Sequence, residues 1–196
     1  MAIVGIESLV YGVEDVELCA RFFSDFGLAP VAASNSLAEF AVDEGSRVIL
    51  RNAADPQLPR SSLVGTGVRE VVWGVDNETN LQTLVAGVGR DRDVTRDADG
   101  TVHFLTDCGL PMALRVFQKR PVHCAPDPIN APGAVNRMNT HRKWRKRARP
   151  RAIQHVVFTA VSFESTYKFF CERLGFRISD LQKGRSEERR VGKECQ

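Results

Sequence analysis

Long apolar runs are missing from the 196-residue sequence. None approaches the roughly 20 residues that a bilayer-spanning helix needs, and the first residues lack the basic and apolar stretches of a signal peptide. The five cysteines are scattered, with no two of them in CxxC spacing. An odd, unpatterned set argues against a disulfide framework and favours a reducing compartment. We therefore expect a cytoplasmic protein that has no membrane partner.

The motifs of three common enzyme classes are missing as well. There is no GxGxxG fingerprint of dinucleotide-binding proteins, no Walker A phosphate loop and no GxSxG motif of serine hydrolases. Candidate functional residues must therefore come from isolated side chains and from the order of the predicted strands and helices.

The net excess of positive charge is confined to one segment. The net charge is +3, but residues 142–151, RKWRKRARPR, hold seven cations and no acid, so the rest of the chain carries −4. Nucleic-acid-binding proteins usually present a basic face or stripe on an otherwise basic domain. We therefore interpret the segment as a solvated strap and expect no specific nucleic-acid partner. Trp144 among the cations leaves contact with RNA or DNA phosphates as the alternative.

The first 118 residues repeat one order of elements. Residues 3–13 are typical of a strand, and Asp15 and Gly27 are placed to begin and end a helix. Three short strands are predicted after it, at about 29–34, 37–42 and 47–51. From residue 67 a strand, a helix and three strands follow again, at 67–75, 76–89, 92–96, 101–106 and 111–117. The sequence therefore predicts two βαβββ modules in tandem.

The helix of the first module has an apolar stripe at three- and four-residue spacing, which predicts a core-facing side. We expect its phenylalanines, like Trp73, to lie in the core. The stripe consists of Val16, Cys19, Phe22, Phe23 and Phe26.

The pattern of the first module begins again at residue 152. RAIQHVVFTA, residues 151–160, predicts a strand that carries His155 where the first strand carries Ser8. The other matches are Ser162 for Asp15, Phe169 and Phe170 for Phe22 and Phe23, and Gly175 for Gly27. Several matches in the same order predict an internal repeat.

The pattern ends near residue 183. The following residues include RSEERRVGKEC, which resembles translated adaptor or vector sequence, with a disordered charged tail as the alternative. We expect a complete domain over 1–119, a proline-rich and then basic linker over 120–150, the start of a second domain over 151–183, and a non-native or disordered tail over 184–196. The chain is thus expected to be a fragment.

A strand with an early histidine, a capped helix and the FF…LGF pattern of residues 169–176 resemble the vicinal oxygen chelate superfamily. That family includes glyoxalase I, bleomycin-resistance proteins, methylmalonyl-CoA epimerases and type I extradiol dioxygenases. The resemblance covers residues 3–118 and 151–182. It implies an α+β fold of tandem βαβββ modules, two per domain around a cavity, with the second domain truncated here. Because the family spans several chemistries, the resemblance is less specific for the reaction.

Metal ligands of the resembled family lie on the first strand of each module and on the last strand. On this chain these positions hold Ser8, Glu70 and a residue near Met112–Leu114, where no carboxylate occurs. A serine and one glutamate make no metal site, so the first domain is expected to be metal-free. In this respect the chain is similar to type I extradiol dioxygenases, whose first domain is a degenerate copy.

The resemblance implies a parent protein that holds Fe(II) with two histidines and one glutamate of its second domain. His155 is the one metal ligand expected in this chain, and the others would lie beyond residue 182. The implied parent cleaves a catechol-like aromatic with O₂, whereas the fragment is expected to be inactive and without a cofactor. The alternative is a metal-free module that sequesters a small aromatic or drug-like ligand. A homo-oligomer is left open.

For each candidate ligand, local sequence patterns also allow a purely structural role. His155 could be a polar strand residue, although alternation places it opposite Phe158 and toward a cavity. His103 is expected to be a strand residue near a turn, because no carboxylate matches it. Glu70 is expected to be half-exposed, with a cavity-facing position as the alternative. A zinc site at His123 and Cys124 would need a second pair of ligands.

Overall fold

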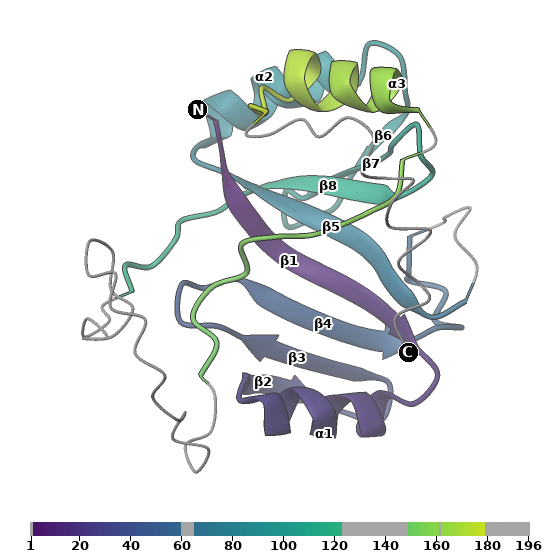
Figure 1. Ribbon diagram of the computed structural model, residues 1–196, viewed down its shortest axis with the longest axis vertical. Coiled ribbons are helices and arrows are strands. Elements are labelled where there is room, and N and C mark those ends of the chain that lie inside the picture. Colours follow the sequence, from purple (N-terminus) through teal and green to yellow (C-terminus); the bar gives the residue numbers. More distant parts are fainter. Residues whose placement is uncertain (1, 60–64, 123–148, 161, 179–196) are drawn as a thin grey trace, which may run out of the picture.

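A mixed sheet of eight strands forms the centre of the molecule (Figure 1). The computed structural model describes residues 2–59, 65–122, 149–160 and 162–178. Within that part of the chain, no helix combines the length and the apolar character that a membrane crossing needs. The predicted tail and most of the predicted linker lie outside the described residues.

The elements follow the predicted order of two βαβββ modules. The first module consists of β1 (Ile3–Val13), α1 (Val16–Phe26), β2 (Ala29–Ala33), β3 (Leu37–Ala41) and β4 (Arg47–Asn52). The second consists of β5 (Gly67–Val75), α2 (Glu78–Val88), β6 (Val94–Arg96), β7 (Val102–Leu105) and β8 (Pro111–Val116). The α+β class and the tandem modules expected from the sequence are therefore confirmed.

The two modules meet at the middle of the sheet. The strand order is β2-β3-β4-β1-β5-β8-β7-β6, with β1 and β5 antiparallel. Each of these strands also pairs in parallel with the last strand of its own module, β1 with β4 and β5 with β8. The halves of the sheet are therefore related by an approximate two-fold axis between β1 and β5.

The helix caps that the sequence predicted are present. The Asp15 carboxylate accepts a hydrogen bond of 2.8 Å from the Leu18 amide, and Gly27 ends α1 with a φ of 102°. In the repeat, the Ser162 hydroxyl accepts a bond of 3.3 Å from the Ser165 amide. Such caps supply partners for amide groups that a helix end leaves unpaired.

Alternation of side chains along the strands divides the sheet into two different faces. On β5, Val71, Trp73 and Val75 are buried in the core beneath α2, whereas Glu70 and Val72 point to the opposite face. The same core contains residues of β1 and β8, and a second core lies between α1 and the strands β3 and β4. The helices therefore cover one face and leave the other for a site.

The prediction that the phenylalanines of α1 lie in the core is wrong for two of them. Phe22 is 62% exposed and Phe26 is 53% exposed, and their rings stack on each other. The helix rests on the sheet through Val16, Ala20 and Phe23, which recur at helical spacing on a neighbouring face. Trp73, by contrast, lies in the core as predicted.

The strand predicted at 151–160 is absent from the described structure. The segment is extended but forms no ladder, and it crosses over β1 and β5 (Figure 1). Those strands already pair with each other and with β4 and β8, so their backbone groups are occupied. The side chains of the segment still point alternately toward the core and toward solvent. Val156 and Phe158 pack on the core, whereas His155 and Val157 are exposed.

A buried carboxylate holds the beginning of this segment. Glu44, in the β3–β4 turn, is 6% exposed. Its side chain accepts hydrogen bonds from the Ile153 amide at 2.9 Å and the Ser46 hydroxyl at 2.8 Å, and it pairs with Lys119 at 3.0 Å. Its own amide donates to the Arg151 carbonyl at 2.9 Å. Because a buried charge needs partners, Glu44 fixes the segment at this point.

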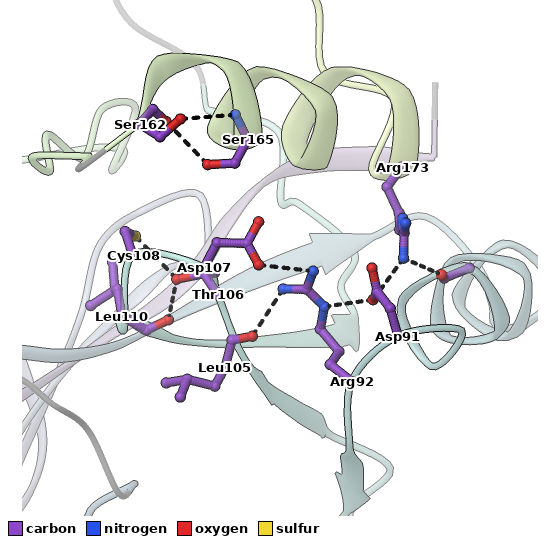
Figure 2. A network of polar contacts seen from close by, with 11 residues as sticks. Asp91, Arg92, Leu105, Thr106, Asp107, Cys108, Leu110, Ser162, Ser165 and Arg173 are labelled. Atoms are coloured by element: carbon purple, nitrogen blue, oxygen red, sulfur yellow. Dashed lines mark hydrogen bonds and ion pairs between the residues drawn. The ribbon is translucent and has the colours of Figure 1, made fainter.

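The helical elements α3 (Phe163–Tyr167) and η1 (Lys168–Arg173) dock beside α2. Figure 2 shows the polar part of this contact, in which Arg173 reaches Asp91 at 2.7 Å. Arg92 lies 4.3 Å above the ring of Phe169 and bonds Asp107 at 3.2 Å. Phe169 is 4% exposed, so η1 contributes to the same core as α2, β5 and β8.

A substitution at Glu44 tests the attachment of the segment. We expect Glu44→Ala to speed hydrogen exchange at the Ile153 amide and to lower the free energy of unfolding by about 1–3 kcal/mol, because a buried donor loses its acceptor. The matched control is Asp43→Ala, which removes an exposed pair with Arg149 and should cost about 0–1 kcal/mol. Equal effects of the two substitutions on Ile153 exchange would contradict the assignment.

Candidate functional site

The face of the sheet opposite the helices is hollowed. The hollow has a volume of about 310 Å³ and is lined by residues of β1, β3, β4, β5, β7 and β8. A neighbouring hollow of about 670 Å³ shares Gln57, Pro59, Glu70, Asp97 and His103 with it. The two modules therefore build one open-faced cavity, and we call its 310 Å³ part the sheet hollow.

Acidic side chains outnumber basic ones in the sheet hollow. The carboxylates are those of Glu7, Glu39, Glu70, Asp97 and Asp99. The basic groups are those of Arg47, Arg51, Arg115 and His103. Most of these residues stand on strands where alternate positions are apolar and buried, so the pleat sends them to the same face.

A histidine between two carboxylates forms one wall of the hollow. His103 Nδ1 lies 2.7 Å from Glu70 Oε1, and Nε2 lies 3.1 Å from Asp97 Oδ2. A protonated ring donates a hydrogen bond from each nitrogen. His103 is the strand residue that the sequence predicted, on β7, but the expectation that no carboxylate matches it is wrong. Glu70 is only 4% exposed and faces the hollow, so the alternative for this residue holds and not the half-exposed position.

Strand register explains why the sequence did not predict this pair. Val72 of β5 stands beside Ala113 of β8, which stands beside His103 of β7. Glu70 lies two residues along β5 from Val72, on the same face. Because Ala113, on the strand between β5 and β7, is small, the longer side chains of Glu70 and His103 meet above it.

The carboxylates raise the pKa of His103 above its ordinary value of 6.5. The hydrogen bond from the ring to Glu70 is the largest cause, burial opposes it, and the charges of Glu70 and Asp97 add to the rise. A group whose pKa is raised by folding stabilises the fold while it is protonated. That stabilisation is complete below 6.5 and is lost as the pH rises through the folded-state pKa.

A second charged group lies across β1, β3 and β4. Arg47 bonds Glu7 Oε1 through Nη2 at 2.6 Å and through Nε at 3.1 Å, and it bonds Glu39 through Nη1 at 3.0 Å. Glu7 is 5% exposed. Sequence reasoning missed this group, although Arg47, Ile49 and Arg51 alternate around buried residues on β4 and all face the hollow.

The positions implied as metal ligands do not form a metal site. Ser8 and Glu70 do line the hollow. Met112 and Leu114, however, are buried in the core beneath α2. Ala113 lies between them on the opposite face and has no donor atom. Over the ranges that the structure describes, no group of three His, Cys, Asp or Glu side chains is arranged to hold a metal ion.

His155 lies apart from the sheet hollow. It is exposed on the segment that crosses the helix-bearing side of the sheet, and its role as a metal ligand remains a prediction. His123, Cys124 and residues 142–148 of the basic strap fall outside the described residues.

The stability of the protein should depend on pH through His103. We expect the free energy of unfolding to fall as the pH rises through the raised pKa of His103, because the ring then loses its charge between Glu70 and Asp97. Glu70→Gln should weaken this dependence more than Asp97→Asn, since Asp97 is 66% exposed in its side chain and Glu70 only 5%. Urea unfolding across this pH range measures the effect, and a larger effect of Asp97→Asn would contradict the assignment.

Comparisons with known proteins bear on the fold. No protein-family model and no curated protein matches the sequence. Among solved structures, the chain is similar to a Mn(II)-bound glyoxalase from Novosphingobium aromaticivorans, with 21% identity and a TM-score of 0.64 over 93% of this chain and 56% of that one.

Two dioxygenases give similar agreement. The 2,3-dioxygenase LapB from Pseudomonas sp. KL28 matches with 18% identity and a TM-score of 0.65 over 90% of this chain and 60% of its own. A 2,2',3-trihydroxybiphenyl 1,2-dioxygenase from Sphingomonas wittichii matches with 15% identity and a TM-score of 0.61 over 91% and 59%. This chain thus spans 56–60% of the length of these proteins. With its paired βαβββ modules, the chain has the vicinal oxygen chelate fold that glyoxalases and extradiol dioxygenases share.

Proposed function

We propose that this chain is part of a two-domain, Fe(II)-dependent extradiol dioxygenase that cleaves a catechol-like aromatic with O₂. One observation carries the proposal. After the two modules, the sequence pattern of β1 and α1 returns, with His155 at the position that corresponds to Ser8. The repeat keeps the helix cap at Ser162 and the left-handed glycine at Gly175, which has a φ of 73°.

The extent of the structural likeness supports this proposal. The two dioxygenases match 90% and 91% of this chain, which is more than the first domain contains. The likeness therefore extends beyond the first 119 residues. In the proposed protein, the first domain is a scaffold and the second domain holds the iron.

The described residues do not fit an iron site by themselves. In the sheet hollow, Glu70 is engaged by His103, and the β8 residue beside His103 is Ala113, which has no side-chain ligand atom. His155 offers one imidazole, whereas the 2-His-1-carboxylate set needs three converging ligands. Iron chemistry therefore belongs to the whole protein, in which Fe(II) would act as a Lewis acid and hold both reactants.

The residues of this chain have a positioning role in the proposal. Glu44 fixes the backbone at Ile153, two residues before His155, and Arg173 fixes the end of η1 to Asp91. These contacts lie on either side of the histidine along the chain. They would hold the first strand and helix of the second domain against the first.

The sheet hollow favours a second candidate, a metal-free module that binds a small molecule. Strands of both modules position the charged lining of the hollow, so a ligand could bind there without a contribution from another domain. The two candidates differ in where the ligand lies, because iron and catechol would bind in the second domain.

The chain as it stands should not form an iron enzyme. We expect it to bind Fe(II) no better than an unrelated protein with one exposed histidine, because a single imidazole leaves the metal mostly hydrated. Anaerobic titration with Fe(II) and oxygen consumption with catechol measure this. Stoichiometric iron binding and ring cleavage by the 196-residue chain would contradict the proposal.

In a protein that carries the complete second domain, His155 should be essential. We expect His155→Ala to remove iron and ring cleavage together, and to lower iron affinity by more than the roughly 10–100-fold that loss of an outer-shell partner costs. His155→Gln should retain weaker binding, because an amide oxygen is a poorer ligand. The matched control is His103→Gln, which lies in the first domain and should keep the iron. Retention of iron and turnover by His155→Ala would refute the role of His155.

A further inference from the structure

The sheet hollow carries an excess of negative charge. Five carboxylates and three arginines line it, so its net charge is −2 with His103 neutral and −1 with His103 protonated. The strands also shield it from bulk water on one side, and in such a site the electrostatic field is stronger than in solution. The hollow therefore favours a cationic occupant and disfavours an anionic one.

A buried carboxylate oxygen in the same hollow has no partner. Glu7 Oε1 takes both of the bonds that Arg47 gives to this side chain, while Oε2 is buried and, among the described residues, has no hydrogen-bond partner. The Glu7 side chain is only 7% exposed. A buried acceptor without a donor destabilises the fold, so this oxygen is a position where a ligand that brings a donor would gain free energy.

The arrangement of the side chains in the hollow favours an ammonium group over a metal ion as the bound cation. In the part of the chain that the structure describes, no group of three His, Cys, Asp or Glu side chains could hold a metal ion, and His103, which lines the hollow, is already held by two carboxylates. A metal ion would have to break these pairs. An ammonium group needs only one or two acceptors and carries its own donors, and the terminal torsion of a glutamate side chain is soft enough to turn a free oxygen toward it.

We propose that the sheet hollow is a binding site for a small organic amine, whose ammonium group pairs with Glu7. The rim carboxylates Asp97 and Asp99, which have side chains 66% and 50% exposed, attract the cation to the mouth of the hollow. Glu39, on the other side of Arg47, adds negative charge within the hollow. The proposal concerns the first domain alone and does not depend on whether the second domain binds iron.

A matched series of ligands tests the charge preference. Putrescine, butanediol and succinate share a four-carbon chain and differ in their end groups, which are ammonium, hydroxyl and carboxylate. We expect putrescine to bind the full chain, and the diol and succinate to bind at least about tenfold more weakly. Isothermal titration at low ionic strength gives the affinities, and added salt should weaken putrescine binding because it screens the exposed rim charges.

Substitutions then locate the bound ammonium group. Glu7→Gln should weaken putrescine binding at least about tenfold, because an amide removes the charge and can place a donor at the free position. Glu14→Gln, an exposed residue just beyond the end of β1 and outside the hollow, is the control and should leave the affinity unchanged. Thermal unfolding establishes that each variant is folded. If Glu7→Gln does not fold, Glu39→Gln, with a side chain 19% exposed, should show the loss instead.

Three results would overturn the proposal. The first is that putrescine does not bind, and the second is that butanediol or succinate binds equally well. The third is that Glu14→Gln loses as much affinity as the folded Glu7→Gln or Glu39→Gln variant. None of these results bears on iron binding in the second domain, so the two proposals fail separately.

Discussion

The antiparallel pairing of β1 with β5 is the interaction on which the rest of the structure depends. It extends from the Ile3–Val75 pair to the Gly12–Gly67 pair and joins two modules that could not bury their sheets alone. Because each of these strands also pairs with the last strand of its module, the join makes one continuous sheet. The helices of both modules then cover the same face, and charged residues are left to share the other.

The charged face is stable because nearly all of its buried groups are paired across strands. Glu70 meets His103 over Ala113, and Glu7 meets Arg47 between β1 and β4. Isolated charges in such positions would cost several kcal/mol each, as estimates for buried ions indicate. The pairs reduce this cost, so the fold can keep ionisable groups in a concave surface, where a ligand can reach them.

The order of elements could be predicted from the sequence because the signals are local. Asp15 and Gly27 stand at the ends of α1, and the repeat shows in Ser162 and Gly175. The strand expected at 151–160 could not be judged in this way, because a strand exists only where a neighbour offers free backbone groups. Local sequence patterns could not predict the site either, because Glu70 and His103 are 33 residues apart in sequence and meet only through strand register.

The two modules, their helix caps and the return of the pattern at residue 152 can all be read from the sequence, because spacing and capping act within a few residues. Which side chains face each other depends on the packing of the strands and could not be read from local patterns. The pairing of His103 with two carboxylates and the free oxygen of Glu7 depend on this, as does the attachment of Ile153 to Glu44. The physical reason is that register and layer packing bring together residues that are distant in sequence, and charge and burial then fix their chemistry.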